Sequence, residues 1–269
     1  QDFMKAGLFD RAEEAFRALE GTAFTTDARL ALLTLYERAR EWHQAIDVAQ
    51  RLQAAGAGSF ASRIAHYWCE VALEAEARGR PEEADQALKK SLEASPQAPR
   101  PQILIGQRHA RAGRHAQALE AWSVVLAAHP AAFALVARDY AASAQACGQQ
   151  QQAHDALLAL FQRAPAIDVL LAINKLEPAA AARRELLGRH LRQQPSLSAA
   201  LALVQERVNE RGQADDPEIA LIQQTLDQAA TPLQRYRCAA CGFEALHYFW
   251  QCPGCQGWDT YPTQRAEDL

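Results

Sequence analysis

The sequence predicts an all-α protein, a right-handed tetratricopeptide-repeat superhelix, followed by a small rubredoxin-like metal-binding module. The 269 residues include 58 alanines against 13 glycines and 12 prolines, which favours close-packed helices. A short turn motif recurs along most of the chain, and four of the six cysteines fall between Cys238 and Cys255. We expect the repeat array over residues 1–232 and the module over residues 233–269.

The repeat is marked by short turns that each close on an alanine. The closing alanines are Ala12, Ala45, Ala84, Ala118 and Ala153, so the steps between them are 33, 39, 34 and 35 residues. A period near 34 residues is that of the tetratricopeptide repeat. A generic alanine-rich bundle is the alternative, but it does not explain why the units share several markers.

Each marker has a mechanical role in a pair of antiparallel helices. A glycine five residues before the closing alanine lets the backbone turn, at Gly79, Gly113 and Gly148. The small alanine lets the two helices approach closely. A proline twelve residues after the alanine ends the second helix, at Pro96, Pro130 and Pro165.

The two ends of the array depart from this pattern. Gly7 occupies the fifteenth position of its unit, so Gln1 is the ninth, and we expect a truncated first repeat that lacks eight positions. After Pro165 the markers weaken. We expect two degenerate helix pairs there, over residues 167–176, 180–193, 197–210 and 218–229.

The first helices of stacked pairs line a concave surface that typically binds segments of other proteins. The repeat register places several polar side chains on this surface. They are Thr34, Glu37, His66, Glu76, Arg100, Gln107, Arg111, Arg138 and Gln145. Their mixed charges indicate a peptide partner rather than one uniformly acidic ligand.

Several classes of protein are not favoured by composition or motif. A formal net charge of −4 and a pI near 6.1 provide no overall basic field for nucleic acid. The sequence has no long apolar run typical of a membrane span, no signal peptide and no phosphate-binding loop. Gly56–Ala61 formally matches a dinucleotide fingerprint, but it lies between repeat helices, and His66 beside Cys69 is interpreted as core. We therefore do not expect an enzyme.

The last part of the chain carries the metal-ligating pattern, because Cys238 pairs with Cys241 and Cys252 pairs with Cys255 as two C-x-x-C knuckles. Four thiolates make the closed tetrahedral set that one zinc or iron ion takes, and ligand type does not separate the two metals. Such a set leaves no open position for hydrolytic catalysis. His247 is surplus to it, and redox disulfides are the alternative.

The chain resembles the lipopolysaccharide assembly protein B family of Gram-negative bacteria. The resemblance rests on the run Tyr236–Phe243, on Trp250–Cys255 with its rubredoxin-type knuckle, on the opening Gln1–Glu13 and on Trp42–Ala49. It implies that Cys238, Cys241, Cys252 and Cys255 hold the family's metal. The family's N-terminal membrane anchor has no counterpart in this sequence.

The resemblance also implies a function for the whole protein. It implies an adaptor on the cytoplasmic side of the inner membrane that promotes degradation of the lipid A pathway deacetylase (LpxC) by the membrane AAA protease FtsH. Other lipopolysaccharide-assembly proteins would be further partners. Three alternatives stay open: electron transfer by an iron site, a general peptide-binding co-chaperone and a nucleic-acid-binding zinc ribbon. The ribbon is the weakest because residues after 232 include three basic side chains against four acidic ones.

Overall fold

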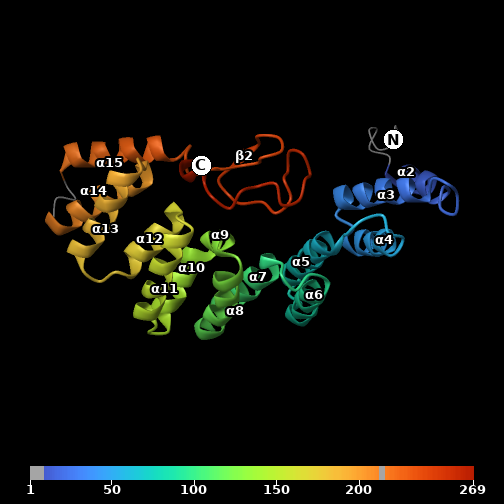
Figure 1. Ribbon diagram of the computed structural model, residues 1–269, viewed down its shortest axis with the longest axis horizontal. Helices are drawn as coiled ribbons and strands as arrows, with labels where there is room; N and C mark the ends of the chain where they lie inside the picture. The colour runs from blue at the N-terminus through green and yellow to red at the C-terminus, as the bar shows by residue number, and fades with distance from the viewer. Residues whose placement is uncertain (1–8, 212–215) are drawn as a thin grey trace. The chain divides into compact units, whose positions relative to one another are not determined.

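The computed structural model describes residues 9–211 and 216–269 and is helical through most of them (Figure 1). The chain divides into two compact units, Gln1–Leu104 and Ile105–Leu269. Each consists mainly of helices packed in pairs, which confirms the expected all-α repeat class. The turn that contains Gly7 lies outside the described residues. None of the described helices is both long and apolar enough to cross a membrane.

The first unit contains the helices α2 (Phe9–Arg17), α3 (Thr25–Ala39), α4 (Trp42–Ala54), α5 (Ala61–Ala77) and α6 (Pro81–Ala94), and helix α7 (Pro99–Arg111) begins in it. Helix α3 packs on α4, α4 on α5, and α5 on α6. The core between them includes Leu32, Leu52 and Tyr67, all at most 2% exposed. Gly56 and Gly58 lie in the turn between α4 and α5, as expected of an inter-repeat loop.

The second unit continues with α8 (His115–Ala128), α9 (Pro130–Phe133), the 3₁₀ turn η1 (Ala134–Val136), α10 (Ala137–Ala146), α11 (Gln150–Arg163), α12 (Ile167–Leu176), α13 (Ala180–Gln193), α14 (Leu197–Arg211) and α15 (Pro217–Ala230). The four helices expected after Pro165 are all present, with ends within one residue of the prediction. Helix α10 packs on α8, α11 and α12, and α14 packs on α13 and α15.

The repeat markers have the predicted roles. The closing alanines are buried, from 0% exposed at Ala45, Ala84 and Ala118 to 2% at Ala12. Gly79, Gly113 and Gly148 have φ of 71°, 72° and 74°. The same left-handed conformation occurs at the end of α3 with φ 57°, but there the residue is Arg40. One repeat therefore lacks the glycine that its turn favours.

Gly106 of α7 lies directly against Trp122 of α8. A Cβ atom added to Gly106 would lie 2.2 Å from Nε1 and 2.5 Å from Cε2 of the indole ring. Trp122 is fully buried, so the ring has no open space to move into. The indole ring of Trp122 therefore fits between the two helices only because residue 106 is a glycine.

The metal module, residues 233–269, contains two short strands. Strand β1 (Tyr236–Arg237) pairs antiparallel with β2 (Glu244–Ala245), and Gln251 forms an isolated bridge with Trp258. A short 3₁₀ turn, η2 (Ala266–Asp268), ends the module. The module belongs to the second unit, and Leu135 of η1 packs against its aromatic core.

Candidate metal centre

The two knuckles bring four cysteine sulfurs together, all within 4.8 Å of one another. Sγ of Cys238 lies 3.8 Å from Sγ of Cys255, and Sγ of Cys241 lies 3.6 Å from Sγ of Cys252. A tetrahedral ion with metal–sulfur bonds of about 2.3 Å would hold its sulfurs about 3.8 Å apart. The spacing therefore fits one ion, and the residues form a rubredoxin-type metal site.

Glycines allow the knuckles to close around this space. A Cβ atom at Gly254 would lie 3.3 Å from Sγ of Cys241, and one at Gly257 would lie 3.4 Å from Sγ of Cys255 and 2.8 Å from Thr260. Gly242, which follows the first knuckle, has φ 77°. Side chains at these positions would crowd the sulfurs or strain the turn.

Hydrogen bonds and crowding act in opposite directions on the thiols of the first knuckle. Burial opposes ionisation of Cys238, but hydrogen bonds from Thr260 and the backbone lower its pKa to about 6. A backbone hydrogen bond at Phe243 favours the Cys241 thiolate. Local desolvation and the three neighbouring sulfurs outweigh that bond and raise the pKa of Cys241 to about 12. A bound cation would remove this conflict by stabilising all four thiolates together.

Two hydroxyl groups lie beside the cysteines and were not predicted from the sequence as part of the site. Oγ1 of Thr260 lies 3.3 Å from Sγ of Cys238. The Tyr261 hydroxyl lies 4.0 Å from Sγ of Cys252 and donates to the carbonyl of Phe243 at 3.2 Å. Such contacts orient ligands and tune a metal site. Their only signal in the sequence is position, three and four residues beyond Gly257.

The cage has a buried side and an exposed side. Cys238 and Cys252 are 1% and 0% exposed and pack with Tyr236 and Tyr261. Cys241 and Cys255 are exposed. His247 is exposed and lies outside the group of four. Of the other two cysteines, Cys69 is buried as expected, whereas Cys147 is only half-buried because it ends helix α10.

Three of the predicted partner-binding residues are buried in the first unit. Glu37 accepts hydrogen bonds from Arg63 at 2.6 Å and from Tyr67 at 2.5 Å, so it links α3 to α5. Arg100 pairs with Glu70 at 2.5 Å and lies within 3.4 Å of Nδ1 of His66. Glu37, His66 and Arg100 are 7%, 3% and 4% exposed. These side chains hold first helices together instead of presenting a free surface.

The other predicted partner-binding residues are more accessible. Glu76 is half-buried in the first unit, while Arg138 and Gln145 are exposed on α10. Gln107 and Arg111 line a cavity of about 370 Å³, together with Ala110, His115, Asp139, Ala142 and Ser143. This cavity lies between α7 and α10, both first helices of their pairs. Contact of these residues with a partner stays a prediction.

Paired helices and a four-sulfur cage define a tetratricopeptide-like repeat protein with a rubredoxin-type metal module. Residues 236–261 match the family model described as "Rubredoxin metal binding domain". The chain shares 30% sequence identity with lipopolysaccharide assembly protein B from Escherichia coli K12, in an alignment that covers all of this chain and 70% of that protein. It shares 25% identity with the protein of the same name from Haemophilus influenzae, over 97% of this chain and 67% of that protein. The chain belongs to the lipopolysaccharide assembly protein B family.

Two matching solved structures are less similar in sequence. A tetratricopeptide repeat protein from Parabacteroides merdae has a TM-score of 0.42 and 13% identity, covering 85% of this chain and 89% of its own. A double mutant of MamA RS-1 also has a TM-score of 0.42, with 20% identity over 62% of this chain and 94% of its own.

Proposed function

We propose that this protein is a non-enzymatic adaptor that regulates lipopolysaccharide synthesis. In this proposal it acts at the cytoplasmic side of the inner membrane and promotes FtsH-dependent proteolysis of the lipid A pathway deacetylase, LpxC. Membership of the lipopolysaccharide assembly protein B family over the whole chain is the observation that carries the proposal. The array, residues 1–232, would hold the partner proteins, and the metal module, residues 233–269, would be a separate functional part.

The chemistry of the metal module supports a structural role for its ion. Cys238, Cys241, Cys252 and Cys255 would hold zinc or iron, and the ion supplies charge neutralisation and cross-links between the two knuckles. Four sulfur ligands complete a tetrahedral shell, so substrate would have no coordination position. The ion would therefore support the shape of the adaptor and take no part in bond cleavage.

The decisive experiment compares cysteine variants of the protein expressed in cells. Cys238→Ser combined with Cys241→Ser should abolish metal binding and lengthen the half-life of the deacetylase in cells. Cys147→Ser is the matched control, because this cysteine lies outside the cage, directly after the end of α10. An unchanged deacetylase half-life in a protein that has lost its metal would reject the coupling between the ion and the adaptor.

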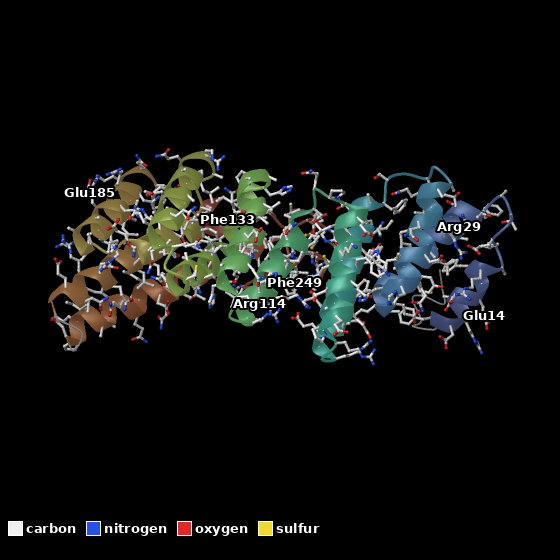
Figure 2. The ribbon with its side chains drawn as sticks, turned by 90° about the horizontal axis from the view of Figure 1, so that it is seen from below. Glu14, Arg29, Arg114, Phe133, Glu185 and Phe249 are labelled. Atoms are coloured by element: carbon white, nitrogen blue, oxygen red, sulfur yellow. The ribbon has the colours of Figure 1, made fainter. Side chains whose placement is uncertain are left out.

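The partner-binding surface can be tested at Arg138. This side chain is exposed on α10. Arg100, in contrast, is buried in an ion pair with Glu70, so reversal of the charge at Arg100 would test folding instead of binding. Arg138→Glu should reduce co-purification of the protease or the deacetylase. Arg189→Glu on α13 is the control, because Arg189 is exposed and pairs with exposed Glu185 at the outer edge of this unit (Figure 2). Equal recovery of both partners with both variants would remove Arg138 from the surface.

Electron transfer by an iron site is the alternative that an observation favours, because Cys241 and Cys255 are exposed. A reversible redox couple in the purified protein would support it, and a zinc-only active form would exclude it. The nucleic-acid alternative loses support because the basic side chains of the module are paired. Arg237 and Arg235 lie 2.7 Å and 3.7 Å from Glu244, and Arg265 pairs with Asp168.

A further inference from the structure

Arg265, near the end of the metal module, contacts the repeat helices. Nε and Nη2 of Arg265 lie 2.6 Å and 3.0 Å from the two carboxylate oxygens of Asp168, near the start of α12. Nη1 of Arg265 donates to the carbonyl of Gln234 at 2.5 Å, and the guanidinium lies 4.9 Å from the centre of the Tyr236 ring. One side chain thus connects α12 to the first strand of the metal module.

The two acidic residues that follow bind the starts of two helices. The carboxylate of Asp268 accepts from the backbone N–H of Ile167, at 3.0 Å and 3.1 Å, where α12 begins. Glu267 accepts from the N–H of Ser198 at 2.9 Å, in the first turn of α14. Such bonds satisfy amides that a helix leaves unpaired, and negative charge there favours the helix dipole.

Helix α12 depends on this contact because its own sequence supplies no cap. The residue at its N-cap position is Ala166, which has no side-chain hydrogen bond to offer. The carboxylate that serves instead comes from Asp268, 101 residues later in the chain. We call Arg265, Glu267 and Asp268 the C-terminal clasp.

The clasp is attached to both chain segments that enter and leave the metal cage. Its backbone pairs with the entering segment, where Ala266 N–H donates to Arg235 at 2.8 Å and Glu267 N–H donates to Leu233 at 3.0 Å. The leaving segment is fixed to the first knuckle, because Ala239 N–H donates to the carbonyl of Thr260 at 2.8 Å. The position of the clasp therefore follows the position of the knuckles.

Without an ion, a small aromatic core and a few hydrogen bonds would be left to hold the knuckles in place. Within the metal module, whose residues 233–269 are all described, regular strand pairing is confined to two strands of two residues each. A module of this size buries too little apolar surface to fold unaided, and binding of a structural ion supplies much of its folding free energy.

We propose that metal occupancy of the cysteine cage controls the capping of α12 through the C-terminal clasp. With the ion bound, the knuckles hold Arg265 against Asp168, Asp268 caps α12, and Glu267 adds a contact at the start of α14. Helix α14 also has a local cap, because Oγ of Ser196 accepts from the N–H of Ala199 at 3.0 Å. When the ion leaves, the clasp loses its anchor, the first turn of α12 opens, and the Ser198 amide of α14 loses its acceptor. The array would then change in one defined place, at the start of α12, whichever proteins bind it.

Hydrogen exchange of the purified full-length chain tests this proposal. Exchange should be resolved to single amides, in the ion-loaded protein and after removal of the ion by a chelator under reducing conditions. We expect the amides at Ile167 and Ser198 to exchange about ten-fold faster after ion removal, the change expected for a lost cap. Amides in the middle of α11 should keep their rates. Unchanged rates at Ile167 and Ser198, or equal loss of protection in α11, would overturn the proposal.

A substitution separates the clasp from the ion. Arg265→Met should accelerate exchange at Ile167 and Ser198 to a similar extent while the metal content stays that of the unmodified protein. Arg189→Met is the matched control and should leave both rates unchanged, because Arg189 is exposed on α13. If the Arg265→Met variant keeps its metal and the exchange rates at Ile167 and Ser198 do not change, the clasp does not couple metal occupancy to the helix starts. These readouts do not depend on the proposed partners.

Discussion

Substitution of Arg265 by Met should destabilise the protein more than substitution of its partner Asp168 by Asn. The pair is geometrically symmetrical, with two nitrogen–oxygen contacts of 2.6 Å and 3.0 Å. Its surroundings are not symmetrical, because two further carboxylates, those of Glu267 and Asp268, lie in the same contact region. Arg265 is the cation that pairs directly with this group, and Arg138 lines the same small cavity, whereas Asp168 is one of three anions.

The structure sets the size of both effects. The side chains of Arg265 and Asp168 are only 20% and 12% exposed. Removal of one partner from a buried ion pair typically costs about 3–5 kcal/mol, and we expect a loss in this range for Arg265→Met. Asp168→Asn keeps the shape and leaves Arg265 with Gln234 and the Tyr236 ring. It also relieves repulsion of Asp268, so we expect a loss of about 1–2 kcal/mol.

Urea unfolding of the ion-loaded protein, followed by circular dichroism, measures both free energies of unfolding. Arg189→Met, which removes an exposed arginine, should change the free energy of unfolding by less than about 0.5 kcal/mol. Equal losses for Arg265→Met and Asp168→Asn, or a larger loss for Asp168→Asn, would refute the reasoning that charge asymmetry governs this contact.

Three further predictions concern single positions. Gly106→Ala should lower the free energy of unfolding by about 1–3 kcal/mol, because the new Cβ clashes with buried Trp122. An increase of about 1 kcal/mol in the free energy of unfolding, typical of Gly→Ala in an open helix, would contradict this prediction. Arg40→Gly should raise the free energy of unfolding by about 0.5–1 kcal/mol by relieving the left-handed backbone, and a loss would show that the Arg40 side chain matters more. Burial and the nearby Asp168 and Glu267 raise the pKa of Asp268 to about 6, so the folded protein binds this proton more tightly than the unfolded chain. That stabilisation is complete below about pH 4 and lost as the pH rises through 6; Asp268→Asn should remove this dependence, and an unchanged pH profile of unfolding would argue against the assignment.

The repeat fold was predictable because its markers act locally. Each closing alanine and each left-handed glycine acts within one helix pair, so a short window of sequence contains the whole physical reason for the turn. The end of α3 shows the limit of this logic. Arg40 occupies the glycine position there, and packing of the surrounding helices imposes the turn on an unfavourable residue.

The metal cage was predictable for a related reason. All four ligands lie between Cys238 and Cys255, and the C-x-x-C spacing itself brings two sulfurs to one ion. The hydroxyl of Thr260 was missed because its contact with Cys238 depends on how the second knuckle folds back.

The partner surface was only partly predictable, because the repeat register gives the face of a helix but not the neighbour of a side chain. Glu37 and Arg138 occupy the same kind of face, yet Glu37 meets Arg63 of the next first helix and is buried, while Arg138 is exposed. The clasp was not predictable at all from local pattern. Arg265 and Asp168 are 97 residues apart, and the sequence shows them only as two charges of opposite sign.

The position of the caps shows why this contact can act as a control point. Helix α15 caps itself, since Asp216 accepts from the N–H groups of Glu218 and Ile219. Such a local cap forms with the helix and cannot respond to anything elsewhere. Helix α12 has Ala166 at the same position and takes its cap from Asp268, so its first turn is complete only while another element is in place. A helix whose cap resides in a metal-dependent module has a stability that depends on metal, whereas a self-capped helix does not.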